Sequence, residues 1–476
     1  MQTNNENRGK KILKDFGVYS IGVIGNRLIS FLILPFYTYF ISNPSDYGYY
    51  DLCLNVCLTL LPITTLQMRE SAFRFLLNND NEQSKEKIIS FIIRSLLISF
   101  SVVVVASVFI YLYADIRFFV LAVIMLLSMT FFDTWLQMVR GLSGNTNYVN
   151  FSVVLSFLIF LLSVLLIAIL KMGIEGIFLS MTLSRVFVFI YGEFKTRIIR
   201  QYFHIHINTQ SVSKNILKYS LPLIPSIFLS SLVSTSNRFF IENFVSMHAN
   251  GIYAVAFRFN MVMGAFALVF YQTWQETAFL QYNSKDRDEF FSKVFNYFLI
   301  ILSFVLITSS FLLKINSWII ADEYGEAFKY LFLIGIAQFF SSLSGSFFEL
   351  GYQCSKETYR EIFSAFFVFV VNAIFCFYLA SIFGIYGVVT ANIIAYFVLT
   401  VYRYIETKRY FTIKIYNRSF FLIPIVGIGA ILFELDYGAL VDFISLLFLL
   451  LSLYLILPKE LYRELVNSIK KKLNLS

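Results

Sequence analysis

The chain has 476 residues, of which 58% are hydrophobic and 14% are charged, and its mean hydropathy is +0.72. Soluble globular domains are about 45–50% apolar and about 25% charged, so this composition excludes an ordinary soluble domain. The net charge of +9 comes from Lys and Arg distributed between apolar runs, and we expect no nucleic-acid partner.

Apolar runs of about 20 residues, long enough to cross a bilayer as helices, recur through the whole chain. The first follows the basic segment RGKKILK and is expected to remain in the protein as a span. The runs predict an all-α polytopic membrane protein with about 14 transmembrane helices. The predicted spans are 12–41, 47–69, 88–111, 117–139, 148–170, 177–194, 215–241, 249–280, 289–313, 327–351, 359–382, 385–403, 419–433 and 440–457.

Two sequence correspondences relate the halves of the chain. An ILK tripeptide precedes both YGYYDL around Gly48 and NGIYAV around Gly251. GIEGIF at 173–178 opens the predicted sixth span, and GIYGVV at 384–389 opens the twelfth. Repeats inserted with the same orientation are related by an axis along the membrane normal, and a cavity between them is the expected substrate site.

The correspondences divide the predicted spans into two pseudo-symmetric six-helix halves plus two C-terminal helices. The predicted domains are an N-terminal six-helix bundle at 1–200, a C-terminal six-helix bundle at 201–410, and two additional transmembrane helices with a basic amphipathic tail at 411–476.

The first span carries a permanent charge near mid-membrane, Arg27, preceded by Asn26. An arginine at a helix centre costs about 2.5–3.5 kcal/mol on insertion scales, so it should face water or a partner. In the second span, Asp51 and Asn55 are four residues apart and share one helix face. Both are candidates for cavity-lining or coupling roles, and Asp51 is also a candidate buried partner for Arg27.

The sixth, seventh and eighth spans add further deep arginines. Arg185 lies near the middle of the sixth span and is a possible cavity-lining or coupling residue. The seventh span repeats the Asn-Arg pair of the first, and the first, seventh and eighth spans would line a cavity between the repeats. These positions predict a cationic substrate-binding cavity, with buried ion pairing as the open alternative. The predicted cavity residues are Asn26, Arg27, Asn237, Arg238 and Arg258.

Charged residues also collect toward the cytoplasmic ends of several spans. Ion pairs among them would form an inner gate that breaks when the cavity opens inward, whereas ordinary interfacial charges are the competing interpretation. The gate candidates are Glu70, Arg74, Asp133, Arg140, Glu276 and Glu349.

The loops divide the cations unequally. With the N-terminus placed in the cytoplasm, only Arg117, Lys171 and Lys314 of the 38 Lys and Arg residues fall in outer loops. Because cytoplasmic loops of membrane proteins carry an excess of Lys and Arg, both termini are predicted to be cytoplasmic.

Motifs for catalysis are not found. The sequence contains neither a G-x-x-x-x-G-K-[ST] phosphate loop nor an H-E-x-x-H zinc motif. Its four cysteines lie in or beside apolar helices without accompanying histidines, so they are expected to be packing residues rather than disulfides or metal ligands. We therefore predict no catalytic residues, no metal site, no cofactor and no enzymatic activity.

The segment LKDFGVYSIGVIGNRLISFLILPFYTYFISNPSDYGYYDL resembles the opening of bacterial polysaccharide-biosynthesis flippases. These are the Wzx-type O-antigen translocases of the multidrug/oligosaccharidyl-lipid/polysaccharide (MOP) exporter superfamily. The matching features are a first span ending in LPFYTYF, a short outer turn, and YGYYDL at the start of the second span. The span layout and the two six-span halves extend the likeness over the whole chain.

The resemblance implies transport of a polyprenyl-pyrophosphate-linked oligosaccharide, such as an O-antigen or capsule repeat unit. Alternating access would move it from the cytoplasmic to the outer leaflet of the bacterial inner membrane. The family's cavity arginines, thought to bind pyrophosphate or acidic sugars, match Arg27, Arg238 and Arg258, and arginine's planar fork suits phosphate oxygens. Membrane lipid and other glycan-assembly proteins are the expected partners.

Two alternatives remain at this level. One is a cation-coupled multidrug exporter of the same superfamily, although such exporters rely on membrane acids and the deep charges here are mostly basic. The other is a non-transport membrane scaffold for glycan assembly, which leaves the mid-membrane arginines unexplained.

Overall fold

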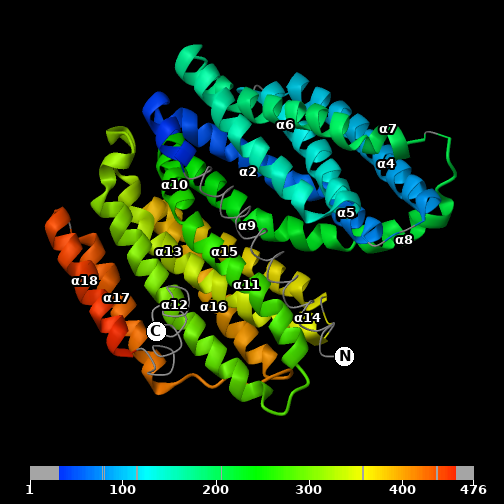
Figure 1. Ribbon diagram of the computed structural model, residues 1–476. Coiled ribbons are helices and arrows are strands. Elements are labelled where there is room, and N and C mark those ends of the chain that lie inside the picture. The colour runs from blue at the N-terminus through cyan, green and yellow to red at the C-terminus, as the bar shows by residue number, and fades with distance from the viewer. Residues whose placement is uncertain are drawn as a thin grey trace, which may run out of the picture. The chain divides into compact units, whose positions relative to one another are not determined.

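The computed structural model describes residues 32–456 except 78, 80, 114, 115, 205, 356, 358, 436 and 437 (Figure 1). The described residues form helices joined by short connections and include no β-strand. Eleven of these helices are long and apolar enough to cross a membrane. The number is twelve if α2 (Pro44–Thr64) and α3 (Met68–Leu76), which meet at a bend of 54°, form one span. The prediction of an all-α polytopic membrane protein is confirmed.

The total of fourteen spans stays a prediction. The predicted spans 117–139 and 148–170 lie in one helical stretch of 51 residues, which joins α5 (Phe119–Ser163) to the π-helical turn η1 (Val164–Ile169). Such a stretch would be about 77 Å long if straight, against about 30 Å of bilayer hydrocarbon. Gly144 interrupts it with φ 82° and ψ 175°, a conformation that glycine adopts without steric cost. The first predicted span is described only from residue 32 onward.

The chain divides into two compact units, Met1–Gly251 and Ile252–Ser476. The predicted domain boundaries stay predictions. Beyond α2, α3 and α5, the first unit contains α4 (Glu82–Tyr113), α6 (Ile174–Thr196), α7 (Ile198–Tyr202), α8 (Gln210–Ser220), α9 (Leu223–Phe244) and the start of α10 (Met247–Phe259).

Aromatic packing fixes α5 against α6 in the first unit. Trp135 of α5 is buried, and its ring centroid lies 5.4 Å from that of Phe189 of α6. Gly192 of α6 makes this approach possible, because a Cβ atom there would lie 2.2 Å from Trp135 Cη2. The indole nitrogen Nε1 donates a hydrogen bond to Glu193 Oε2 at 3.1 Å, so the buried polar edge of the ring is satisfied.

The second unit contains the remaining helices. They are α11 (Met261–Gln281), α12 (Arg287–Ile315), α13 (Ala327–Leu343), α14 (Glu349–Ser355), α15 (Tyr359–Phe383), α16 (Ile385–Thr407), α17 (Leu422–Glu434) and α18 (Ala439–Ile456), with short turns η2 (Ser317–Ile319), η3 (Asp322–Tyr324), η4 (Ser344–Phe348) and η5 (Asn417–Phe421).

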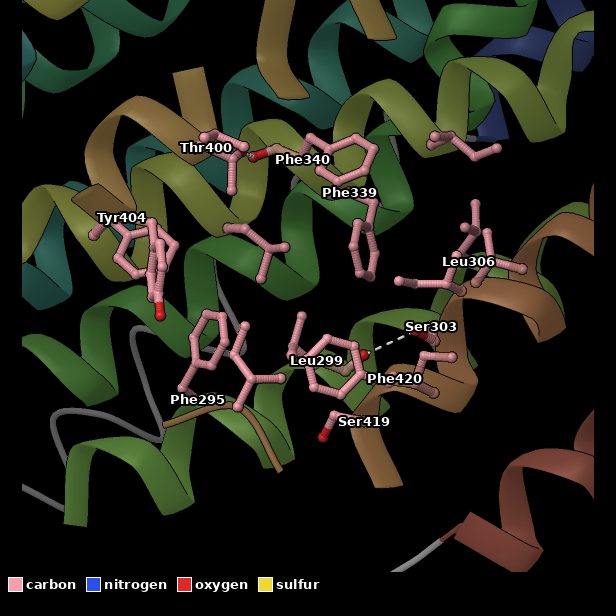
Figure 2. A pocket seen from close by; sticks show the side chains of 18 residues that line it. Phe295, Leu299, Ser303, Leu306, Phe339, Phe340, Thr400, Tyr404, Ser419 and Phe420 are labelled. Carbon is pink, nitrogen blue, oxygen red and sulfur yellow. Dashed lines mark hydrogen bonds between the residues drawn. The ribbon is translucent and has the colours of Figure 1, made fainter. Parts of the chain in front are cut away.

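Within the second unit, the two C-terminal helices pack on α12. Lys314 at the end of α12 forms an ion pair with Asp442 of α18 at 3.1 Å and donates to the carbonyl of Phe433 at 2.7 Å. An apolar cavity lies among α12, α13, α16, η5 and α17 (Figure 2).

The sequence correspondence at GIEGIF and GIYGVV has a backbone counterpart. Gly173 precedes α6 with φ 58° and ψ −134°, and Gly384 precedes α16 with φ 59° and ψ −131°. Gly387, three residues later, lies so close to the preceding helix that a Cβ atom would be 2.0 Å from the carbonyl oxygen of Leu379. The matched glycines therefore make equivalent tight turns between neighbouring helices.

The other pair of matched glycines lies at a helix crossing. A Cβ atom at Gly48 of α2 would lie 2.4 Å from the carbonyl oxygen of Met247, and one at Gly251 of α10 would lie 1.9 Å from that of Pro44. Asn250 is fully buried there, and its Nδ2 donates to the carbonyl of Gly48 at 2.7 Å. Only glycine at both positions lets these backbones approach so closely.

Candidate functional site

A stripe of polar side chains runs between α2 and α9. Asp51, Asn55 and Thr59 lie one turn apart on α2, as the sequence spacing requires. On α9, Thr235 and Arg238 are also buried, and Arg238 is 1% exposed. Because bilayer hydrocarbon offers no hydrogen bonds, polar groups at this depth must satisfy one another.

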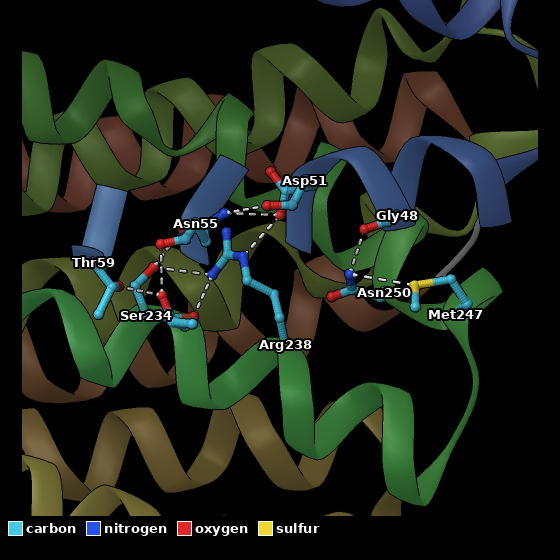
Figure 3. A network of polar contacts seen from close by, with 9 residues as sticks. Gly48, Asp51, Asn55, Thr59, Ser234, Arg238, Met247 and Asn250 are labelled. Carbon is cyan, nitrogen blue, oxygen red and sulfur yellow. Dashed lines mark hydrogen bonds and ion pairs between the residues drawn. The ribbon is translucent and has the colours of Figure 1, made fainter. Parts of the chain in front are cut away.

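The centre of the stripe is an ion pair (Figure 3). Arg238 Nε donates to Asp51 Oδ2 at 2.7 Å, and Asp51 is 3% exposed. Arg238 Nη1 donates to the carbonyl and hydroxyl oxygens of Ser234 at 2.7 and 2.9 Å. Asn55 Nδ2 donates to the backbone carbonyl of Asp51 at 2.7 Å. The guanidinium and carboxylate thus form one neutral, hydrogen-bonded group.

Two threonines extend the network along the helix pair. The hydroxyl of Thr235 donates to the carbonyl of Asn55 at 3.0 Å and lies 2.6 Å from the hydroxyl of Thr59. Thr235 of α9 therefore holds α2 through one bond to its backbone and one contact between hydroxyl groups. The contacts of the stripe can fix the rotamer of Arg238 and keep its charged guanidinium group within the buried helix interface.

The other predicted cavity residues have different placements. Asn26 and Arg27 lie outside the described residues. Asn237 is buried on α9 at 2% exposure, beside the ion pair in sequence. Arg258 lies on α10 in the second unit and is half-buried. A joint cavity of these residues stays a prediction.

Arg185 and Asp133 form a second charged cluster in the first unit. Arg185 of α6 donates from Nη1 to the carbonyl of Met181 at 2.8 Å and interacts electrostatically with Asp133 of α5 and Tyr50 of α2. Its Nε is buried and has no hydrogen-bond partner within the described part of the chain. The positive charge of Arg69 also interacts electrostatically with the Asp133 carboxylate. Asp133, a gate candidate, therefore interacts with Arg185, for which the sequence suggested a cavity-lining or coupling role.

The remaining gate candidates of the first unit make local contacts. Glu70 is bound by its neighbour Arg69, with 3.3 Å between Nε and Oε1. The Arg140 guanidinium lies 4.1 Å from the ring centroid of Phe73, and its Nε donates to Asn145 Oδ1 at 3.0 Å. Arg74 is exposed on α3. A gate made from these residues stays a prediction.

Glu349, the gate candidate of the second unit, belongs to a buried network. Arg403 of α16, 5% exposed, donates from Nη1 to Glu349 Oε2 and to the carbonyl of Ser344, at 2.7 and 2.9 Å. Its Nη2 donates to the hydroxyl of Ser364 at 2.7 Å. This arginine thus joins α14, η4, α15 and α16. The side chain of Glu276, the other gate candidate of the second unit, lies outside the described part of the protein.

A chain of further ion pairs adjoins this network. Glu406 accepts hydrogen bonds from Tyr352 and from Arg360 Nη1, the latter at 2.5 Å. Arg360 Nε binds Glu357 at 2.6 Å. Hydrogen bonds from Arg360 and Tyr410 lower the pKa of the Glu357 carboxyl, which lies between spans. It therefore remains ionised well below neutral pH.

Sequence reasoning missed Arg403 and Glu406 as site residues. Arg403 ends the predicted span 385–403 and resembles an ordinary interfacial cation. The available signal was the i,i+3 spacing of Arg403 and Glu406, which places both on one helix face. Their partners come from other helices, and nothing in the local sequence identifies those partners.

We expect Arg403→Lys to lower the free energy of unfolding by about 1–3 kcal/mol. A lysine keeps the charge but cannot bind the Glu349, Ser344 and Ser364 oxygens in one planar arrangement, which leaves a buried oxygen without its donor. Thermal unfolding of the detergent-solubilised protein measures the loss. Arg409→Lys, at an exposed position near the same helix end, is the matched control and should unfold like the wild type. Equal melting of all three proteins would contradict the structural role of Arg403.

Comparisons with known proteins give a family and a fold. The family described as polysaccharide biosynthesis protein matches residues 12–274, more than half of the chain. No curated protein matches the sequence significantly.

Several solved structures share this fold. "Lipid II flippase MurJ, inward closed conformation" superposes with a TM-score of 0.74 at 15% identity, covering 94% of this chain and 99% of that one. "MATE in complex with MaD3S" gives a TM-score of 0.55 at 17% identity, with coverages of 83% and 96%. An outward-facing multidrug resistance MATE transporter of the MOP superfamily gives 0.54, with the same identity and coverages. At these identities the likeness shows the fold alone, and this all-helical fold is shared with the three proteins.

Proposed function

Because this chain belongs to the polysaccharide biosynthesis protein family, we propose that it is a flippase for polyprenyl-pyrophosphate-linked oligosaccharide. The cargo would be an O-antigen or capsule-type repeat unit. Alternating access would move it from the cytoplasmic to the outer leaflet of the bacterial inner membrane. The fold shared with the flippase MurJ supports a lipid-linked cargo.

The observation that carries the proposal is the Arg238–Asp51 pair, because it holds a cation ready in the membrane without exposing it. In the described conformation Asp51 occupies Arg238 at 2.7 Å. When the helices separate, a pyrophosphate replaces this carboxylate as the partner of Arg238, since arginine binds phosphate oxygens through a planar fork. The charge of Arg238 then meets an anion in both conformations.

The displaced carboxylate gives the cycle a possible coupling group. Asp51 loses its guanidinium partner in this step, and we assign to it the coupling role that its deep position in α2 suggests. Asn55, which already donates to Asp51, stays beside it in either state.

The other sequence candidates enter the proposal as supporting residues. We assign Arg27 and Arg258 to the same cationic cavity, with Asn26 and Asn237 beside the arginines, and Arg185 to a cavity-lining role. Glu70, Arg74, Asp133, Arg140, Glu276 and Glu349 are proposed to close the cytoplasmic end.

The orientation follows from the loop charges. The excess of cations in the predicted cytoplasmic loops supports a cytoplasmic position for both termini. Other glycan-assembly proteins of that compartment would then supply the lipid-linked cargo.

Reconstitution tests the function directly. Proteoliposomes containing the full chain receive lipid-linked oligosaccharide in one leaflet, and the appearance of the sugar in the other is followed with an impermeant lectin. We expect translocation by the wild type and none by empty vesicles. Transport of an organic cation such as ethidium without movement of the oligosaccharide would overturn the proposal in favour of a drug exporter.

A further inference from the structure

The cavity in the second unit has an apolar wall and a volume of about 320 Å³. Its rings include Phe339 and Phe340 and, on the opposite side of the hollow in Figure 2, Phe295. At its rim, Phe420 and Ile423 are 54% and 71% exposed. In a membrane-spanning protein such side chains face lipid. The cavity therefore adjoins the acyl region of the bilayer.

The few polar side chains of the wall have already used their donor protons. Ser303 donates to the carbonyl of Leu299 at 2.9 Å, Thr400 to that of Tyr396 at 2.7 Å, and Ser419 to Asn296 Oδ1 at 2.6 Å. A sugar or other polar guest would lose its hydrogen bonds with water here without replacing them. A hydrocarbon chain fits this surface.

A larger polar pocket of about 980 Å³ adjoins the cavity, and Ile415 and Ser419 line both. Its cations include Lys414 and Arg418, which are exposed and have no ion-pair partner among the residues that the structure describes. Lys293 adds a third cation, and Asp286 and Glu289 add two carboxylates. The pocket thus offers anion-binding groups and hydrogen-bond acceptors together.

The segment that carries Lys414 and Arg418 is held in place by α12. Asn296, 1% exposed, donates from Nδ2 to the carbonyl of Lys414 at 2.9 Å and accepts from the backbone N–H of Tyr416 at 2.9 Å. The hydroxyl of Ser292 accepts from the N–H of Lys414 at 2.9 Å. This anchoring fixes the backbone of the polar pocket beside the apolar cavity before any ligand arrives.

We propose that these two pockets form a binding site for one phospholipid of the surrounding bilayer, with phosphatidylglycerol as the preferred class. One acyl chain occupies the apolar cavity, the phosphate lies between Lys414 and Arg418, and the headgroup hydroxyls donate to Asp286 and Glu289. Basic pockets between membrane helices bind anionic headgroups in this way. The carboxylates disfavour a pyrophosphate, whose additional negative charge they would repel, so the occupant differs from the proposed cargo.

The headgroup chemistry sets an order of affinity. Phosphatidylglycerol brings an anionic phosphate and hydroxyl donors to a pocket with three cations and two carboxylates. Phosphatidylethanolamine has hydrogen-bond donors in its headgroup but no net charge. Phosphatidylcholine has no net charge and no hydrogen-bond donor in its headgroup. We expect retention to decrease in that order when the full chain is exchanged into detergent with equal amounts of the three lipids and examined by native mass spectrometry.

Substitutions separate the two halves of the site. Lys414→Ala combined with Arg418→Ala should reduce phosphatidylglycerol retention about tenfold, the effect of losing charge-assisted contacts. The control pair Lys285→Ala and Arg409→Ala removes the same charge from exposed positions outside the pocket and should retain lipid like the wild type. Ile336→Trp fills the apolar cavity and should also abolish retention with both cations intact.

Four outcomes would overturn the assignment. They are undiminished retention in the Lys414/Arg418 variant, equal retention of phosphatidylcholine, displacement of the lipid by millimolar inorganic phosphate, and displacement by an equal concentration of polyprenyl pyrophosphate. The last would give the site to the cargo. Because lipid retention is measured without transport, failure of this assignment is distinguishable from failure of the proposed flippase activity.

Discussion

Arg238→Ala is expected to lower the free energy of unfolding by about 3–5 kcal/mol and to abolish translocation. The substitution leaves the Asp51 carboxylate, 3% exposed, without its cationic partner, and an uncompensated buried charge is strongly destabilising. Asp51→Ala should cost a similar amount, because it leaves the guanidinium unpaired. Thermal unfolding in detergent measures stability, and the lectin assay in proteoliposomes measures translocation.

A double variant separates stability from transport. Asp51→Asn with Arg238→Gln removes both charges and keeps groups that can hydrogen-bond, so stability should return most of the way to the wild-type value. Translocation should remain lost, because no cation is left to bind a pyrophosphate. Normal transport by this variant would show that Arg238 serves only to hold α2 against α9, and the proposed cargo site would be wrong.

Gly251→Ala is expected to prevent the close crossing of α10 and α2. The added Cβ would lie 1.9 Å from the carbonyl oxygen of Pro44, an atom of the backbone that no rotamer change can move. Overpacking a core by a methyl group usually costs about 1–3 kcal/mol, and a rigid backbone contact puts this substitution at or above the upper end. The hydrogen bond from Asn250 to Gly48 should be lost with it.

Hydrogen exchange at the start of α10 reports this crossing, and thermal unfolding reports the overall cost. Gly427→Ala is the matched control, since Gly427 lies within α17 and has nothing within 4 Å of an added Cβ. Alanine has the better helix propensity, so the control should be neutral or more stable by up to about 1 kcal/mol. Identical behaviour of the two variants would contradict the need for glycine at the crossing.

The repeat was readable from the sequence at the positions that later proved structural. Gly173 and Gly384 were matched by their neighbours in sequence, and their backbone angles agree within a few degrees. Gly48 and Gly251 were matched in the same way, but their mutual contact was not predictable. A glycine in a sequence indicates that a close approach is permitted, and it does not say which segment approaches.

The candidate site was only partly readable. The cost of burying an arginine singled out Arg238 and Arg185, because that cost depends on the residue and its depth alone. The same reasoning overlooked Arg403, which lies at a span end where a cation is unremarkable. It also found nothing around Lys414 and Arg418, because their pocket depends on Asn296 holding a connecting segment from another helix.

The sequence by itself determined the membrane-embedded all-helical class and which apolar segments carry charge, since hydropathy and insertion cost are local properties of about twenty consecutive residues. Only the tertiary structure decided what those charges meet. Arg238 and its partner Asp51 are separated by 187 positions in the chain, and helix packing alone brings them to 2.7 Å. Helix packing therefore sets whether an arginine within a span is buried in an ion pair or exposed to a cavity. No local sequence pattern encodes that packing.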